Sequence, residues 1–379
     1  MDSLTQIRLT RELIDIDSTT GNEAKAGEWI ARLLERLGYH VVCQPVAPHR
    51  FNVIATLAAS GPPALVFSTH FDCVPPFFPS RLTAGGVVTG DLVAGEAVAG
   101  EAVAGGLQPA GSHAGSTPRS DRLHGRGACD AKGILMAQIA AAERLRAAGE
   151  ARVGLVFVVG EERGSEGARA ANTLASGCRF LINGEPTDNR IGAATRGVYR
   201  VKLRATGRAA HSSLPELGES AIDKLLDALI TLRGVSWPED PLLGRTFYSI
   251  GLINGGVAPN VISPAADAEL MFRTVGGHEP LRALIEQTVG HLVAVEDILV
   301  VPPVMLTPVP GMESTVFSFT TDIPFLDRWG APVLAGPGSV TVAHTADEYC
   351  EIAELERAVD VYVQVVGKLL SQKPEPSST

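Results

Sequence analysis

Cysteine and aromatic residues are scarce in this chain: its 379 residues include 5 cysteines, and 5% are aromatic. The cysteine count is odd and no Cys-x-x-Cys pair occurs, which favours reduced thiols in a cytoplasmic protein over a disulfide framework. No apolar run reaches 18 residues, so we expect no membrane span. Residues 1–6 lack the basic and apolar segments of a secretory signal, which again favours the cytoplasm.

Basic residues are also in short supply. The chain has 32 Lys and Arg against 42 Asp and Glu, a formal net charge of −10 at pH 7. Nucleic-acid binding needs a basic footprint, so this balance disfavours DNA or RNA as a partner. The phosphate loop G-x-x-x-x-G-K-[ST] is missing as well, which disfavours a nucleotide-binding protein.

Apolar content is ample at 45%, and the length suggests two domains. Short apolar runs predict strands at residues 52–57, 64–69, 153–159 and 180–183. Helical spacing of apolar residues predicts helices at 4–17, 22–37 and 134–145. Strands that alternate with helices indicate an α/β domain with a mainly parallel sheet.

The pattern changes near residue 195. Residues 199–205 alternate apolar and polar side chains, as a half-exposed antiparallel strand does. The elements expected from there to residue 301 follow the order strand–helix–strand–strand–helix–strand, which is ferredoxin-like. The α/β style then returns, with a strand at 331–334 and a helix at 352–370. We therefore predict a larger domain of residues 1–194 and 306–379 with a smaller domain, 195–305, inserted into it.

Residues 83–117 stand apart because they are rich in Gly, Ala and Val. The sequence VAGEA occurs at 93–97 and again at 98–102. An added hairpin is one interpretation, but the glycine content favours a flexible surface insertion within the larger domain.

Acids and histidines follow the predicted strands, where ligands bind in open α/β sheets. The residues are His70 and Asp72, Asp130, Glu161 and Glu162, Glu185, and His344. Each is ambiguous alone: Asp130 could cap a helix, and Glu161-Glu162 could be a solvated strand end. Together they offer the nitrogen and oxygen ligands that suit Zn²⁺, Co²⁺ or Mn²⁺.

These motifs resemble the M20 family of metallopeptidases, in the branch of acetylornithine deacetylase and succinyl-diaminopimelate desuccinylase. The resemblance spans nearly the whole chain and is carried by STHFD at 68–72, GRGACDAKG at 125–133, GEE at 160–162, GEPT at 184–187, AHSS at 210–213, and His344 with DEY at 347–349. It implies a zinc-peptidase-like catalytic domain with a mainly parallel central sheet, plus an inserted ferredoxin-like α+β lid that also forms a dimer.

The resemblance implies a role for each matched residue. His70, Asp130 and Glu185 would hold one divalent ion, and Asp130, Glu162 and His344 a second. Zn²⁺ is the expected metal, with Co²⁺ or Mn²⁺ as alternatives. Asp72 would orient His70, and Glu161 would act as general base toward a metal-bound water. The peptide bond after Asp130 is expected to be cis.

Further residues match positions on the inserted domain. His211 is expected to stabilise the reacting carbonyl, in its own subunit's site or in that of the partner of a homodimer. Asn260 and Arg273 are expected to bind a substrate carboxylate, for which the planar guanidinium of arginine is suited. Arg196, near the predicted domain boundary, is a weaker substrate-binding candidate. A structural histidine and a surface salt bridge are the alternatives for His211 and Arg273.

The activity implied is hydrolysis of the amide bond in an N-acyl amino acid or short peptide, with acetylornithine deacetylase the nearest named activity. A desuccinylase, a dipeptidase or a carboxypeptidase of the same family remains open. A catalytically silent metal-binding scaffold is disfavoured because every ligand and base position holds a competent residue. The sequence departs from the family pattern in the long interval between His70 and Asp130, which contains residues 83–117.

Overall fold

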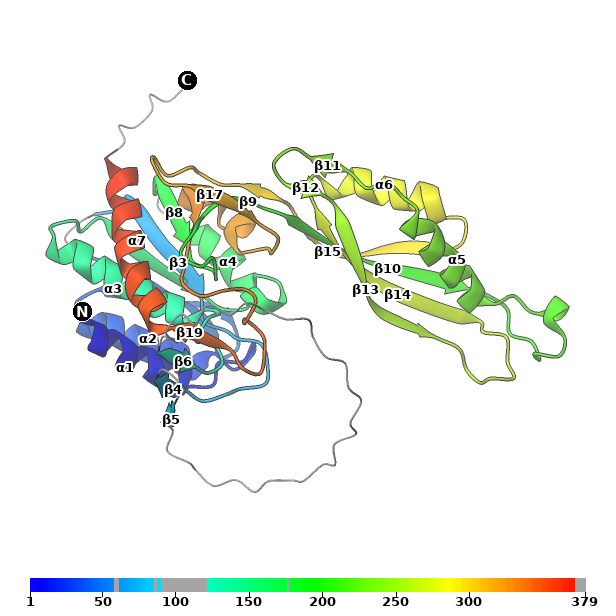
Figure 1. Cartoon of the computed structure of the whole chain (residues 1–379), viewed down its shortest axis with the longest axis horizontal. Coiled ribbons are helices and arrows are strands. Elements are labelled where there is room, and N and C mark those ends of the chain that lie inside the picture. Colours follow the sequence, from blue (N-terminus) through cyan, green and yellow to red (C-terminus); the bar gives the residue numbers. More distant parts are fainter. Residues whose placement is uncertain (58–60, 85–86, 90–120, 176, 372–379) are drawn as a thin grey trace.

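The computed structural model describes residues 1–57, 61–84, 87–89, 121–175 and 177–371, and shows two units (Figure 1). A larger body contains both ends of the described chain, and an elongated unit extends away from it. The prediction for 83–117 falls mostly outside the described residues. At its start, β4 (Arg81–Ala84) and β5 (Val87–Thr89) pair in an antiparallel manner.

A six-stranded sheet forms the centre of the larger body, in the order β1-β2-β7-β3-β8-β18. Its strands are β1 (His40–Ala47), β2 (Arg50–Thr56), β3 (Leu65–His70), β7 (Val153–Val158), β8 (Phe180–Asn183) and β18 (Ala331–Leu334). The last four are mutually parallel, whereas β1 and β2 join in an antiparallel manner. The predicted mainly parallel α/β fold is confirmed.

Helices cover both faces of this sheet, which explains why β3, β7 and β8 are buried along their whole length. One face packs against α1 (Ser3–Ile14), α2 (Ala24–Arg36), α3 (Lys132–Ala147) and α7 (Ile352–Leu370). There Phe67 meets the ring of Tyr362, with centroids 5.1 Å apart. The other face packs against α4 (Glu166–Ala171) and Trp329.

The elongated unit is built on a four-stranded antiparallel sheet in the order β13-β14-β10-β15. Its elements in chain order are β10 (Gly197–Thr206), α5 (Ala221–Arg233), β13 (Phe247–Gly255), β14 (Ala265–Thr274), α6 (His278–Val289) and β15 (Ala294–Val301). Along β10 and β14 every second residue is buried against α5 and α6. The opposite face carries Arg200 and Arg273, and no helix of the described residues covers it (Figure 1).

Several short elements complete the fold. They are β6 (Arg122–His124), β9 (Ile191–Thr195), β11 (Glu239–Asp240), β12 (Gly244–Arg245), β16 (Val304–Met305), β17 (Ser314–Phe317), β19 (Tyr349–Glu351) and single 3₁₀ turns at 161–163, 172–174, 215–217, 323–325 and 327–329. The chain passes between the two units at 195–197 and 301–304; that they are separate domains stays a prediction. Within the described residues, no helix is long and apolar enough to span a membrane.

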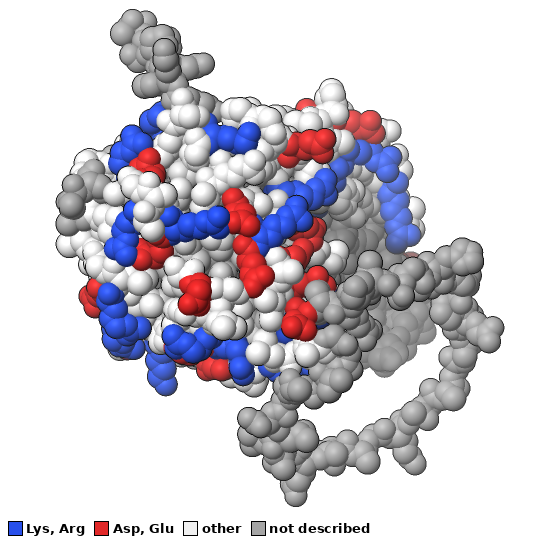
Figure 2. All heavy atoms as spheres, turned by 60° about the vertical axis from the view of Figure 1, so that its left-hand side comes forward, with Lys and Arg blue, Asp and Glu red and all other residues white. Residues whose placement is uncertain are grey.

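Charged side chains are mixed on the face of the larger body that Figure 2 displays. Lysine and arginine side chains form an interrupted band across this face, and aspartate and glutamate side chains lie beside and below it.

Candidate active site

Three neighbouring strands deliver the candidate ligands to one edge of the central sheet. β3 ends at His70, the turn after β7 carries Glu161 and Glu162, and Glu185 follows β8. Because β7, β3 and β8 are adjacent and parallel, their carboxyl ends lie side by side. Asp130 reaches the same place from the loop that precedes α3.

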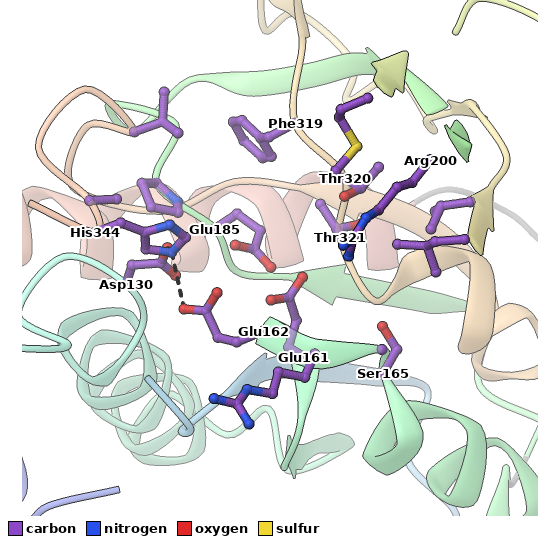
Figure 3. A pocket seen from close by; sticks show the side chains of 18 of the residues that line it. Asp130, Glu161, Glu162, Ser165, Glu185, Arg200, Phe319, Thr320, Thr321 and His344 are labelled. Atoms are coloured by element: carbon purple, nitrogen blue, oxygen red, sulfur yellow. Dashed lines mark hydrogen bonds and ion pairs between the residues drawn. The ribbon is translucent and has the colours of Figure 1, made fainter. Parts of the chain in front are cut away.

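Asp130 lies at the centre of this group and contacts both candidate histidines. Its Oδ1 is 3.0 Å from Nε2 of His70, and its Oδ2 is 3.2 Å from Nε2 of His344. Nε2 of His344 is also 3.1 Å from Oε1 of Glu162, the contact dashed in Figure 3. One carboxylate that uses its two oxygens toward two different histidines has the arrangement of a bridging ligand.

The buried carboxylates of this group lack enough neighbouring positive charge to balance them. Burial raises the pKa of Glu161 and Glu185 well above the glutamate value, and neighbouring carboxylates add to that effect. Oε1 of Glu185 is buried and has no hydrogen-bond partner among the described residues. Hydrogen bonds to Asp130 and Glu162 raise the pKa of His344 to about 10. Buried acids without enough positive charge are costly, and divalent metals would balance them.

The donor set fits such ions. Ligand atoms of His70, Asp130 and Glu162 all lie within 4.8 Å of one another. The carboxylates of Glu161, Glu162 and Glu185 point into the same space (Figure 3). Imidazole nitrogen and carboxylate oxygen together suit Zn²⁺, Co²⁺ or Mn²⁺.

Asp72 is fully buried beneath this group and does more than the predicted orientation of His70. Its carboxylate accepts the backbone N–H of Glu161 at 3.1 Å and that of Glu162 at 3.3 Å. The hydroxyl of Thr20 donates to it at 2.9 Å. Nδ1 of His70 lies closer to the Asp72 carbonyl oxygen, at 2.9 Å, than to the carboxylate, at 3.5 Å. Asp72 therefore fixes the turn that carries the two glutamates.

The loop before α3 presents Asp130 to the site, and Asp130 does not cap the helix. The N-cap of α3 is Ala131, and the Asp130–Ala131 peptide bond is cis, as the resemblance implies. A Cβ atom at Gly133 would lie 2.2 Å from the carbonyl oxygen of Ala128. Only glycine lets the loop close so tightly over the start of the helix.

A cavity of about 620 Å³ separates these residues from the elongated unit. Arg200 and Arg273 line its far side, together with residues 319–321. Arg200 donates to Glu269 at 2.9 Å, whereas Arg273 is half-buried and its guanidinium makes no ion pair or hydrogen bond with any described residue. Burial lowers the pKa of Arg273. The guanidinium of Arg273 therefore lines the cavity, and none of its N–H donors is bound by a residue that the structure describes.

Sequence reasoning missed part of this lining. Arg200, Phe319, Thr320 and Thr321 all face the cavity (Figure 3) but belong to none of the quoted motifs. Of these four, only Arg200 could have been suggested by the sequence, because it is one of the polar residues in the alternating apolar and polar pattern of residues 199–205. Nothing in the spacing around residues 319–321 points to the site.

Five predicted residues lie outside the cavity lining. Two of them, His70 and Asp72, are buried. The other three are His211, Asn260 and Arg196. His211 is exposed and its Nδ1 is 2.8 Å from the Ser213 hydroxyl. Asn260 lies near it, since its carbonyl oxygen accepts the backbone N–H of Ser212 at 3.0 Å. Arg196 donates to the carbonyl of Leu243 at 2.8 Å. Within one chain, His211 and Asn260 are therefore neighbours of each other rather than of the candidate ligands.

Comparisons of the sequence with known proteins identify the family of this chain. A model of the family described as Peptidase family M20/M25/M40 matches residues 107–368. A peptidase M20 domain-containing protein of Schizosaccharomyces pombe is 32% identical over 370 residues, which cover 95% of this chain and 84% of that protein. A probable carboxypeptidase of Aspergillus clavatus is 34% identical over 400 residues, covering 96% and 82% respectively.

The chain belongs to this peptidase family.

Solved structures share the fold of the M20 chain. A tripeptidase from Staphylococcus aureus superposes with a TM-score of 0.74 at 19% identity, covering 98% of this chain and all of that one. A Bacillus subtilis protein described as a dinuclear metal binding peptidase of the M20 family gives a TM-score of 0.66 at 14% identity, with 97% and 98% coverage. The M20 membership predicted from the motifs is confirmed, and the chain is a hydrolase of that family. Its placement in the deacetylase branch stays a prediction.

Proposed function

We propose that this chain is a two-metal peptidase that hydrolyses the amide bond next to a free carboxylate, releasing the terminal amino acid of a short peptide or N-acyl amino acid. The observation that carries the proposal is the unpaired guanidinium of Arg273, across the cavity from the buried acids. A guanidinium binds a carboxylate in a planar, bidentate manner. Substrates with a free carboxylate are thereby held with their amide toward the acids.

Five residues would hold the metals. His70, Asp130 and Glu185 form one ligand set, and Asp130, Glu162 and His344 form the other, with Asp130 shared. Zn²⁺ is the proposed ion, and Co²⁺ or Mn²⁺ would also suit these ligands. When bound, such ions polarise a carbonyl and acidify a water molecule.

Glu161 would move the proton. It shares the turn with Glu162, and Asp72 fixes that turn through its backbone amides. Because burial raises the pKa of Glu161, its carboxylate is a better proton acceptor than an exposed glutamate. After accepting a proton from water, Glu161 would return it to the departing amine, so that a carboxylate and a free amine result.

Carboxypeptidase action and N-acyl amino acid deacetylation both cleave the amide bond to the nitrogen of an amino acid with a free carboxylate. They differ in the acyl group attached to that nitrogen, which is a peptide in the first case and an acetyl group in the second. Relatives 31–34% identical over most of the chain are named probable carboxypeptidases, which favours peptide substrates. The cavity of about 620 Å³ is within the usual range for small-ligand pockets, roughly 300–1,000 Å³, and leaves space beyond an acetyl group. Acetylornithine-type deacetylation remains the second candidate, since Arg273 would bind that carboxylate equally well.

A homodimer would explain the apolar surface of the elongated unit. β13 is an edge strand on which Leu252 and Ile253 are more than half exposed, and α5 exposes Leu226 and Ile230. Exposed edge strands with apolar residues are typical pairing surfaces. We propose that two copies pair here and that His211 serves the partner's cavity. Sedimentation of an Ile253→Lys variant checks this: we expect monomers, and an unchanged dimer would refute the surface.

A substrate panel tests the proposed activity. The assay follows amine release from dipeptides, N-acetyl amino acids and N-succinyl amino acids, each as the free acid and as the C-terminal amide. The protein is used after chelation, with and without added Zn²⁺ or Co²⁺. We expect metal-dependent cleavage of free acids only. Cleavage of amides at equal rates would refute the role of the carboxylate, and cleavage of N-acetyl compounds alone would favour the deacetylase.

A further inference from the structure

Glu348 is a buried carboxylate that binds the backbone of the loop carrying Asp130. Only 2% of its surface is exposed. Its Oε1 accepts the backbone N–H of Gly127 at 3.0 Å and those of Cys129 and Asp130 at 3.1 Å each. Three amides directed at one oxygen fix the path of the chain up to the bridging residue.

The second oxygen of Glu348 is tied to Arg126, which is also 2% exposed. Nη1 of Arg126 donates to Oε2 of Glu348 at 2.6 Å and to the carbonyl of Thr345 at 3.2 Å. Nε of Arg126 donates to the carbonyl of Pro76 at 3.1 Å. The guanidinium therefore joins three segments that are distant in sequence, as its rigid planar set of donors allows.

These contacts connect two ligands that share no helix or strand. Asp130 lies in the loop before α3, and His344 lies in the loop that leads to Glu348 and β19. The backbone N–H of Gly125 also donates to the Glu348 carbonyl at 3.2 Å. Side chain and main chain of Glu348 thus both link the Asp130 loop to the His344 loop.

We infer that Glu348, together with Arg126, is a positioning residue that sets the distance between Asp130 and His344 for metal binding. The inference rests on the proposed two-metal function. It further implies an asymmetry between the sites. The ion held by Asp130, Glu162 and His344 depends on both loops. The other set shares Asp130 but takes His70 and Glu185 from strand ends of the rigid central sheet, so it depends on only one of the two loops.

A purely structural ion pair makes a different prediction. Breaking a buried pair destabilises the whole fold, because one charge is left without its partner. Such a loss would lower thermal stability without discriminating between two metal sites. The affinities of the two sites therefore separate positioning from general stabilisation.

The experiment compares Glu348→Gln with Glu143→Gln and the wild-type chain. Gln keeps an oxygen for the backbone amides but loses the charge that binds Arg126. Glu143 is a matched control: it is 9% exposed, accepts the Tyr39 hydroxyl at 2.9 Å and pairs with an arginine, but lies toward the far end of α3. Zinc binding to chelated protein is titrated against a competing chelator, and the Tm of the chelated protein is measured in parallel.

We expect Glu348→Gln to weaken one of two zinc sites by about 10- to 100-fold, the usual effect of removing a group that supports a ligand. The other site shares only Asp130 with these loops and should be weakened less, whereas both sites of Glu143→Gln should keep nearly wild-type affinity. Two unchanged zinc sites in Glu348→Gln, or equal weakening of both, would overturn the inference. If Glu348→Gln does not fold, Arg126→Lys, which keeps the charge but not the planar donors, must show the same selective loss, and its absence overturns the inference. A wild-type chain that binds no zinc overturns the proposed function itself.

Discussion

Replacing Arg273 by Gln tests how the substrate is held. A free carboxylate paired with this guanidinium would make two charge-assisted hydrogen bonds. Arg273 is half-buried, so we assign each bond the lower value for charged groups, about 1.5 kcal/mol. The sum of about 3 kcal/mol corresponds to a loss of about 150-fold in kcat/KM. Arg273→Lys keeps the charge without the planar geometry, and its loss should be intermediate.

The assay measures kcat/KM for one blocked dipeptide as the free acid and as the C-terminal amide. The wild-type chain should prefer the acid, and Arg273→Gln should lose that preference because the acid slows while the amide does not. Arg204→Gln is a matched control, since Arg204 lies on the same open sheet face but pairs with Glu296 at 3.0 Å and does not line the cavity. An Arg273→Gln variant that still prefers the acid by the wild-type factor would refute the reasoning.

Three further predictions concern the buried acids and their metals. Glu161→Gln should lower kcat by about 10²- to 10⁴-fold, the contribution of a general base, with metal content unchanged; near wild-type turnover would exclude Glu161 as the base. His70→Ala should retain fewer than two metal ions after dialysis, and full occupancy by elemental analysis would count against this ligand. Burial raises the pKa of Asp322 to about 7 from an ordinary value of 3.8. Between these two values the carboxyl is ionised in the unfolded chain but still protonated in the folded one, so the folded state loses stability as pH rises through that window. Asp322→Asn should therefore raise the Tm of chelated protein more at pH 8 than at pH 5, whereas the exposed Asp360→Asn should change neither; equal shifts at both pH values would contradict the burial argument.

The pattern of apolar residues predicted the strands and helices that are buried either on one face or on all sides. The buried runs of β3, β7 and β8 are continuous apolar stretches, and β10 alternates as a half-covered strand does. β1 was missed because it is an edge strand with mixed exposure and contains Pro45. β6 and β17 were missed because they have three and four residues of mixed polarity, which form neither an apolar run nor a period.

The candidate site was predicted as far as motifs placed acids and histidines after strands. Asp130 contacts both His70 and His344, and the bridging role that the resemblance implied stays a prediction. The ion pair between Arg126 and Glu348 was not foreseen, although both lie inside quoted motifs. Their pairing depends on how loops that are distant in the sequence pack together, and this packing cannot be predicted from periodicity or composition.

Reconstitution of chelated protein with metal tests the central claim most directly. Zn²⁺ or Co²⁺ is added in steps to protein stripped of metal, and bound metal and hydrolysis of a free-acid dipeptide are measured on the same samples. The account predicts no turnover without metal and full turnover as occupancy approaches two ions per chain. Undiminished hydrolysis by protein without detectable metal would contradict it.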